Sequence, residues 1–200
     1  MTYPQFFNNI PTIKLQDELA SFLGAFEDGI IEFSYLDVVK SAGHSCPTVL
    51  GAYLMTLQGL KALYEDELPK RGQIIVEFKE SQIDGVAGVI GNVITNITGA
   101  TTTNGFKGIA GKFDRNYLMK FDKDIDGASV RFTRVDTLKS IDVFYDASSV
   151  KPHEDMSFLM QKSIKGIATK EEIEEFKKHW QKRVEVISLN IETVIKTKLL

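Results

Sequence analysis

The sequence has only one cysteine, Cys46, among its 200 residues. A single cysteine forms no disulfide bond within the chain and no zinc site built from several cysteines. The chemistry open to Cys46 is that of a thiol, a thiolate or one metal ligand among ligands of another kind. The neighbours of Cys46 therefore carry much of the functional prediction.

The sequence also lacks the features of proteins that enter membranes. No stretch approaches the roughly 18 consecutive apolar residues that a membrane span needs. The N-terminal residues do not combine a basic start with an apolar run, as a secretory signal does. We expect a cytoplasmic protein with no membrane partner.

A large excess of charge of either sign is absent as well. Lysine and arginine number 24, aspartate and glutamate number 27, and the formal net charge is −3. No global basic field then attracts nucleic acid or an acidic membrane surface, and we expect no nucleic-acid partner. Hydrophobic residues make up 43% of the chain, which is enough for a core of its own.

Hydrophobic periodicity predicts an α+β fold. The predicted helices cover residues 15–26, 37–41, 47–64, 85–98, 156–164 and a long segment from Thr169 to beyond residue 190. The predicted strands cover residues 30–35, 73–78, 112–121, 129–134 and 140–145. We expect the last three strands to form an antiparallel meander. The predicted architecture is an antiparallel sheet packed with long helices, followed by a helical C-terminal extension.

No boundary between domains is visible in the sequence. It has no linker rich in proline and serine, no low-complexity tract and no repeat with a period of tens of residues. We expect a single domain over residues 1–200, with a core over about 15–147 and a helical extension over about 150–200.

The sharpest local feature is the run Gly43-His44-Ser45-Cys46-Pro47 directly before the predicted helix 47–64. Proline suits the first turn of a helix, since it has no N–H to leave unpaired there. Cys46 then lies near the N-cap, where free N–H groups and the positive end of the helix dipole stabilise a thiolate.

This run allows three interpretations of Cys46. Imidazole and thiolate together suit Zn²⁺ or another divalent transition metal, so His44 and Cys46 are the candidate metal ligands. In the second interpretation, His44 is a base that activates Cys46 as a catalytic nucleophile or redox thiol. In the third, Cys46 is a buried structural residue beside a helix cap.

A second candidate site is the glycine-rich loop over residues 99–111 and the residues that follow it. Its glycines match neither a P-loop nor a dinucleotide fingerprint, and they favour tight turns. Thr101, Lys112, Asp114 and Arg115 are the candidates for holding an anionic ligand or cofactor there.

The two other histidines are weaker candidates. His153 follows a proline in a predicted loop, and His179 lies in a helix with paired charges, where we expect a structural residue. No HExxH, GxSxG or paired-cysteine pattern is present, which excludes zincin and serine-hydrolase interpretations.

Two segments resemble the FmdE-like proteins, a family named after formylmethanofuran dehydrogenase. The run from Gly43 to Pro47, with Gly51 four residues after the proline, is similar to the family signature GHxCPGxxxG. Thr98-Gly99-Ala100-Thr101 resembles the family's TGCT segment at the end of a second helix. The resemblance covers about residues 15–147 and marks the chain as a variant without the C-terminal zinc finger of some relatives.

The resemblance implies an α+β core that dimerises and a metal-binding cleft with His44 and Cys46 as ligands. The sequence also departs from the family pattern. Thr48, Asn92 and Ala100 stand where the family has glycine, aspartate and cysteine, so further ligands from those places are lost.

Three functions follow as hypotheses. The first is a metal-binding FmdE-like protein whose remaining coordination positions hold water, a small-molecule ligand, or a residue of the glycine loop or of a second subunit. The second is a thiol-dependent enzyme or redox sensor that uses Cys46 and His44.

The third is a non-catalytic accessory module that forms a homodimer. Small residues allow helices to approach closely, so the predicted dimer surface includes Gly85, Gly88 and Gly91. An apolar C-terminal run also needs a cover, and it consists of Val186, Ile187, Leu189, Ile191 and Val194.

Overall fold

A computed structural model describes residues 2–200, and it confirms the α+β class. The helices are α1 (Glu18–Phe22), α2 (Tyr35–Ala42), α3 (Pro47–Tyr64), α4 (Ala87–Thr98), α5 (Met156–Ile164), α6 (Lys170–Leu189) and α7 (Ile191–Val194). The strands are β1 (Ile13–Gln16), β2 (Ile30–Phe33), β3 (Ile74–Glu77), β4 (Met119–Lys120), β5 (Val130–Arg134), β6 (Ser140–Tyr145) and β7 (Ile195–Leu199). Short 3-10 turns cover Gln5–Asn9 and Glu27–Gly29.

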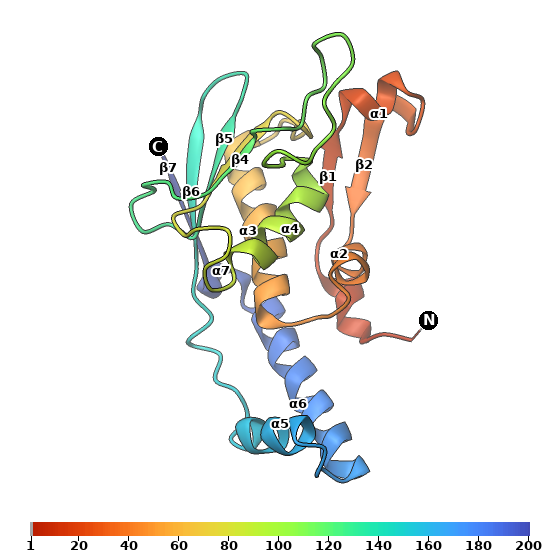
Figure 1. Cartoon of the computed structure of the whole chain (residues 1–200), viewed down its shortest axis with the longest axis vertical. Coiled ribbons are helices and arrows are strands. Elements are labelled where there is room, and N and C mark those ends of the chain that lie inside the picture. The colour runs from red at the N-terminus through yellow and green to blue at the C-terminus, as the bar shows by residue number, and fades with distance from the viewer. Residues whose placement is uncertain (1) are drawn as a thin grey trace.

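Helix α3 is the centre of the molecule. Figure 1 shows the five-stranded sheet on one side of α3 and α4, and the β1–β2 hairpin with α2 on the other side. Twelve of the 18 residues of α3 are buried, because its sequence is apolar around nearly the whole circumference. Its observed bounds confirm the predicted helix 47–64.

The predicted helix over 15–26 is wrong at both ends. Leu15 lies in β1 and pairs with Ile31 of β2, because the two segments form an antiparallel ladder. The helix that follows has only five residues, with Asp17 as its N-cap, and Gly24 beyond it has a left-handed φ of +68°. Apolar spacing that looked helical therefore arises from a strand followed by one helical turn.

The predicted meander is confirmed only in part. Strands β5 and β6 pair in antiparallel fashion, but β4 has two residues and pairs in parallel with β3. The sheet order is β4-β3-β5-β6-β7, so β4 lies at an edge and does not contact β5. Positive φ angles at Phe113 and Tyr117 break the rest of the predicted strand 112–121.

The C-terminal segment is not helical throughout. Helix α6 ends at Leu189, α7 adds one turn, and residues from Ile195 onward form β7, which pairs with β6. The last strand thereby covers the β6 edge of the sheet, and the C-terminus belongs to the core fold. The predicted helical extension is therefore wrong for residues 195–199, which form a strand.

Of the two surfaces proposed for a dimer, the C-terminal run is largely covered by the chain itself. Ile187 and Val194 are buried in the core, Val186 and Ile191 pack against it, and only Leu189 is well exposed, at 71%. Helix α7 and strand β7 return to the body and cover much of this run, so it leaves little apolar surface, and its part in a dimer stays a prediction.

Two of the three glycines around α4 face the chain's own side chains and backbone, whereas Gly85 is exposed and a Cβ there would have no neighbour within 4 Å. A Cβ at Gly91 would lie 3.2 Å from the Sδ of Met119 and from the Cζ of Phe121. A Cβ at Gly88 would lie 2.7 Å from the carbonyl oxygen of Gln82. These two glycines permit close packing within one chain, and the homodimer itself stays a prediction.

A buried ion cluster ties the start of α1 to two distant arginines. Asp17 is 2% exposed, and its carboxylate accepts hydrogen bonds from the backbone N–H groups of Leu19 and Ala20. The same carboxylate binds Arg71 Nη1 at 2.8 Å and Arg115 Nη2 at 2.6 Å. Burial alone would raise the pKa of Asp17, but the Arg71 hydrogen bond and the Arg115 charge outweigh it and lower the pKa.

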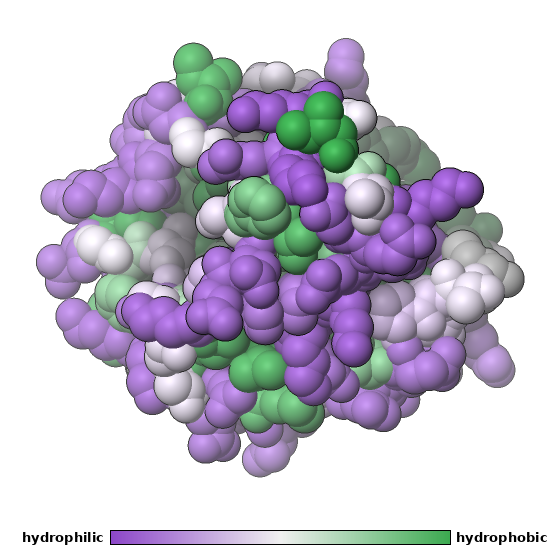
Figure 2. All heavy atoms as spheres, turned by 90° about the horizontal axis from the view of Figure 1, so that it is seen from below, coloured by the Kyte–Doolittle hydropathy of each residue, from purple (hydrophilic) through white to green (hydrophobic). Residues whose placement is uncertain are grey.

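Helices α5 and α6 form a hairpin that projects from the lower end of the body in Figure 1. Seen from that end, in Figure 2, the surface is mainly hydrophilic, and the apolar side chains lie in separate groups. No helix among residues 2–200 is both long and apolar enough to cross a membrane.

Candidate functional site

The site at the start of α3 is built by two helix ends. Helix α2 ends at Gly43, whose left-handed φ of +76° turns the chain away from the α2 axis. Cys46 then adopts an extended conformation as the N-cap of α3, and its Sγ accepts a hydrogen bond from the N–H of Val49 at 3.4 Å. The thiol is thus held at a helix N-terminus, as the sequence predicts.

Ser45 anchors this segment to the interior. Its side chain is buried and lies 2.9 Å from the Tyr35 hydroxyl. Its carbonyl oxygen accepts hydrogen bonds from Trp180 Nε1 at 2.9 Å and Gln181 Nε2 at 3.3 Å, both on α6. Helix α6 therefore fixes the position of the segment.

The residues on either side of Ser45 are more accessible. His44 is exposed and Cys46 is half-buried, which fits an extended segment whose alternate side chains point to opposite sides. His44 Nδ1 lies 3.0 Å from the carbonyl oxygen of Ala42. Because a carbonyl only accepts, Nδ1 carries the proton, and Nε2 has a free lone pair.

Gly51 and Tyr145 support the segment from the sheet side. The Tyr145 hydroxyl donates to the carbonyl oxygen of Pro47 at 2.8 Å. Its ring packs directly against α3 at Gly51, where a Cβ would lie 2.4 Å from the ring atom Cε1. Burial raises the pKa of Tyr145 to about 12, so the hydroxyl is a neutral donor at pH 7.

An apolar cavity of about 580 Å³ opens beside His44 and Ser45. It lies between the N-terminal segment, α2 and α6, and its lining is mostly apolar. The aromatic and aliphatic residues in this lining are Tyr3, Pro4, Phe7, Val39, Phe176 and Trp180. This volume is in the range of small-molecule sites.

The four residues predicted for a second site do not all face one point. Arg115 is buried in the Asp17 cluster, and Thr101 Oγ1 donates to the Arg115 carbonyl at 2.7 Å. Lys112 is exposed, as is Asp114, whose carboxylate accepts from the Asn116 N–H at 2.8 Å. Ligand binding by Thr101, Lys112, Asp114 and Arg115 stays a prediction.

This loop lies at the opposite end of α3 from Cys46. Arg71 Nε donates to the carbonyl oxygen of Ile97, and the Gly72 N–H donates to that of Thr98, so the end of α4 lies beside the segment that follows α3. Figure 1 shows the loop at the top of the molecule and the start of α3 well below it, at the lower end of that helix. An α-helix of this length spans about 27 Å, so a loop residue of the same chain does not reach a metal at Cys46.

The other histidines do not extend the pair of His44 and Cys46 into a metal cluster. Among residues 2–200, no group of three or more His, Cys, Asp or Glu side chains is arranged to hold a metal ion. His153 and His179 stack on each other, with ring centroids 3.6 Å apart. A metal ion at the start of α3 would therefore find at most two His, Cys, Asp or Glu ligands, His44 and Cys46, within residues 2–200.

Tyr35, Tyr145 and Trp180 support the site but were not predicted to do so. They lie 10, 98 and 135 positions along the chain from the residues that they contact. Such separations leave no local pattern in a single sequence.

Comparison with known proteins places most of the chain within one family model. The model described as "FmdE, Molybdenum formylmethanofuran dehydrogenase operon" matches residues 42–196. The match begins at the segment that contains His44 and Cys46 and runs through α5 and α6. No curated protein matches the chain.

Proposed function

Because the chain belongs to the FmdE family, we propose that it binds one divalent transition-metal ion, Zn²⁺ in the first place, through His44 and Cys46. The observation that carries the proposal is the hydrogen bond between His44 Nδ1 and the Ala42 carbonyl oxygen. A metal-bound histidine typically donates its other ring N–H to such a carbonyl, which fixes the tautomer and the ring orientation.

The donor set fits a borderline-soft metal ion. His44 offers Nε2, and Cys46 offers its sulfur, which accepts the Val49 N–H at the start of α3. Both residues are accessible from outside the core, whereas Ser45 between them is not. A metal bound there supplies Lewis-acid chemistry to a ligand in its open positions.

The remaining coordination positions have three sources. Water fills them by default, and a residue of a second subunit is the alternative if the predicted homodimer forms. The third source is a small molecule whose polar head would bind the metal while its apolar body occupies the apolar cavity beside His44. Tyr145 and α6 hold the segment still while that ligand exchanges.

Substitution of Cys46 by serine is expected to abolish stoichiometric metal binding. Wild-type protein purified without an affinity tag should carry about one metal ion per chain, measured by elemental analysis. Cys46→Ser and His44→Gln should each weaken Zn²⁺ binding by about 100-fold or more, since even supporting residues of metal sites are worth 10–100-fold. His153→Gln is the matched histidine control and should retain the metal.

Two results would contradict this proposal. One is wild-type protein without metal that also fails to bind added Zn²⁺. The other is an equal loss of metal in His153→Gln, which would show that binding depends on surface histidines in general.

A second candidate function is thiol chemistry at Cys46, favoured by its half-buried position as the N-cap of α3. In metal-free protein at pH 7, Cys46 should react with iodoacetamide about tenfold faster than glutathione does. His44→Gln should slow the reaction, because the imidazole no longer takes the thiol proton. Equal rates for Cys46 and glutathione, in protein shown to be folded, would exclude an activated thiol and leave the metal proposal untouched.

A further inference from the structure

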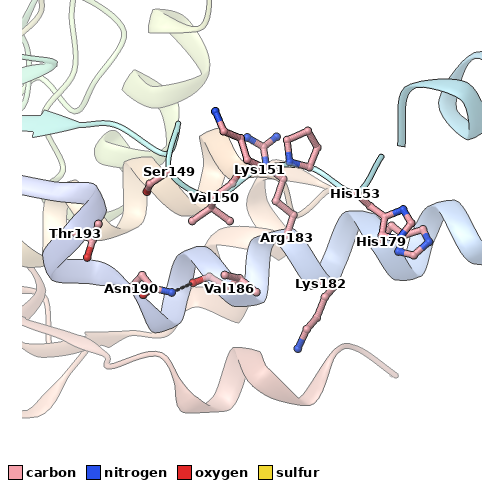
Figure 3. A pocket seen from close by; sticks show the side chains of 11 residues that line it. Ser149, Val150, Lys151, His153, His179, Lys182, Arg183, Val186, Asn190 and Thr193 are labelled. Atoms are coloured by element: carbon pink, nitrogen blue, oxygen red, sulfur yellow. Dashed lines mark hydrogen bonds between the residues drawn. The ribbon is translucent and has the colours of Figure 1, made fainter. Parts of the chain in front are cut away.

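A second cavity, of about 480 Å³, lies on another side of α6 and has a different character. Figure 3 shows it between α6, the start of α7 and the segment that follows β6. Neither His44 nor Cys46 lines it. The lining residues that bear on the argument are Lys151, His153, His179, Lys182 and Arg183, above a floor that includes Val150 and Val186.

The charged residues of this lining are all basic. No aspartate or glutamate lines the cavity, although the whole chain has a net charge of −3. Lys182 is paired with Glu185 at 2.7 Å. Lys151 and Arg183 make no salt bridge within 4.0 Å among residues 2–200, although the Lys151 charge helps to lower the pKa of Asp146 nearby.

Arg183 is held ready for a ligand. Its Nε donates to the carbonyl oxygen of Val150 at 3.1 Å, and Figure 3 shows the side chain reaching from α6 toward the segment that carries Lys151. The two Nη groups make no hydrogen bond within residues 2–200. A guanidinium oriented in this way presents a rigid pair of donors, which matches phosphate or carboxylate oxygens.

Two histidines form one end of the cavity. The rings of His153 and His179 stack at 3.6 Å with an interplanar angle of 13°. His179 Nε2 is buried without a hydrogen bond and lies 3.5 Å from Glu175 Oε1. His153 Nδ1 accepts a hydrogen bond from the Asp155 N–H at 3.3 Å and lies 3.5 Å from Asp155 Oδ2. Each ring therefore has a carboxylate beside it, and the pair closes this end of the cavity without serving as the anion's donors.

We infer that this cavity binds a small organic oxyanion with at least two negative charges, such as a phosphate monoester. Lys151 and Arg183 neutralise the anion, the hydroxyls of Ser149 and Thr193 are further donors, and the valines contact the organic part. The cavity volume suits a ligand larger than inorganic phosphate. This site goes beyond the proposed metal function and does not depend on it.

Calorimetric titration of the full chain in 0.15 M NaCl tests the inference, a salt concentration that screens weak surface attraction. The probes are inorganic phosphate, pyrophosphate and citrate. Pyrophosphate should bind with a Kd of about 1 mM or lower, and more tightly than phosphate. Citrate distinguishes a phosphate ligand from a polycarboxylate ligand. Binding of pyrophosphate without binding of citrate indicates a phosphate compound. Tighter binding of citrate than of pyrophosphate indicates a polycarboxylate.

Arg183→Gln should weaken binding by about tenfold or more, since it removes the paired donors. Lys151→Gln repeats the test with an exposed side chain that makes no hydrogen bond or salt bridge to residues 2–200, so its loss should not disturb folding. Lys61→Gln, an exposed lysine on α3, is the charge-matched control and should bind like the wild type, as should Cys46→Ser.

Three outcomes would overturn the inference. They are no binding of any of the three anions, binding that survives both Arg183→Gln and Lys151→Gln, and an equal loss in Lys61→Gln. The last outcome would indicate attraction by overall charge without a site. Unchanged anion binding by Cys46→Ser that has lost its metal would separate this site from the metal proposal.

Discussion

Replacing Asp17 by asparagine is expected to lower the free energy of unfolding by about 3–5 kcal/mol. The carboxylate is 2% exposed and bonds both Arg71 Nη1 and Arg115 Nη2. Arg115 is itself 6% exposed, so the substitution leaves a buried guanidinium without its counter-charge. Urea denaturation of both proteins at pH 7 measures the difference.

The same substitution should also change how the free energy of unfolding falls at acid pH. The pKa of Asp17 is lowered in the folded protein, so its contribution is fully present above the unfolded value near 3.8. It is lost as the pH falls through the lower, folded value. Asp17→Asn should therefore lose less stability than the wild type between about pH 4 and pH 2.

Asp66→Asn is the matched control for Asp17→Asn, because Asp66 is exposed. It should change stability by less than about 0.5 kcal/mol. If Asp17→Asn lowers the free energy of unfolding by no more than Asp66→Asn does, the buried cluster contributes nothing to stability. In that case the arginines would have to be hydrated or paired elsewhere in solution.

Replacing Gly51 by alanine is expected to lower the free energy of unfolding by about 1–3 kcal/mol, although alanine normally favours a helix. A methyl group there would lie within 2.4 Å of the Tyr145 ring. The ring cannot withdraw freely, because its hydroxyl is bonded to the Pro47 carbonyl oxygen at the start of α3. The shift should also reach Cys46 and weaken Zn²⁺ binding.

A double-mutant cycle separates this crowding from a general helix effect. In a Tyr145→Ala background the ring is gone, so Gly51→Ala should cost little or even stabilise the protein. Tyr145→Phe keeps the ring and loses only the hydrogen bond, which is worth about 1 kcal/mol. Additive effects of Gly51→Ala and Tyr145→Ala would contradict the packing explanation.

The parts of the fold that local patterns specify were predictable. The proline at the first turn and the continuous apolar periodicity gave α3 its correct bounds, and Gly43 marked the end of α2. Strands β5 and β6 were also placed correctly, because each is a short apolar run between turn residues. Because the proline and glycine signals are also local, they placed His44 and Cys46 correctly at the start of a helix.

The errors have a shared cause. Residues 13–16 and 195–199 are strands only because β2 and β6 supply the hydrogen-bonding partners, and neither partner is adjacent in sequence. Likewise, the apolar C-terminal run looked like an exposed interface, whereas its return to the body buries Ile187 and Val194. A hydrophobic pattern shows that a residue will be covered without showing which segment covers it.

The sequence by itself determined the chemistry at the head of α3: one thiol, one imidazole two positions earlier, and a proline that begins the helix. These are short-range relations, fixed by backbone geometry over a few residues. Only the tertiary structure decided that Ser45 is held by Tyr35 and Trp180, that Gly51 admits the Tyr145 ring, and that the glycine loop lies at the far end of the helix. Those relations depend on packing between segments up to 135 residues apart, which no local pattern encodes.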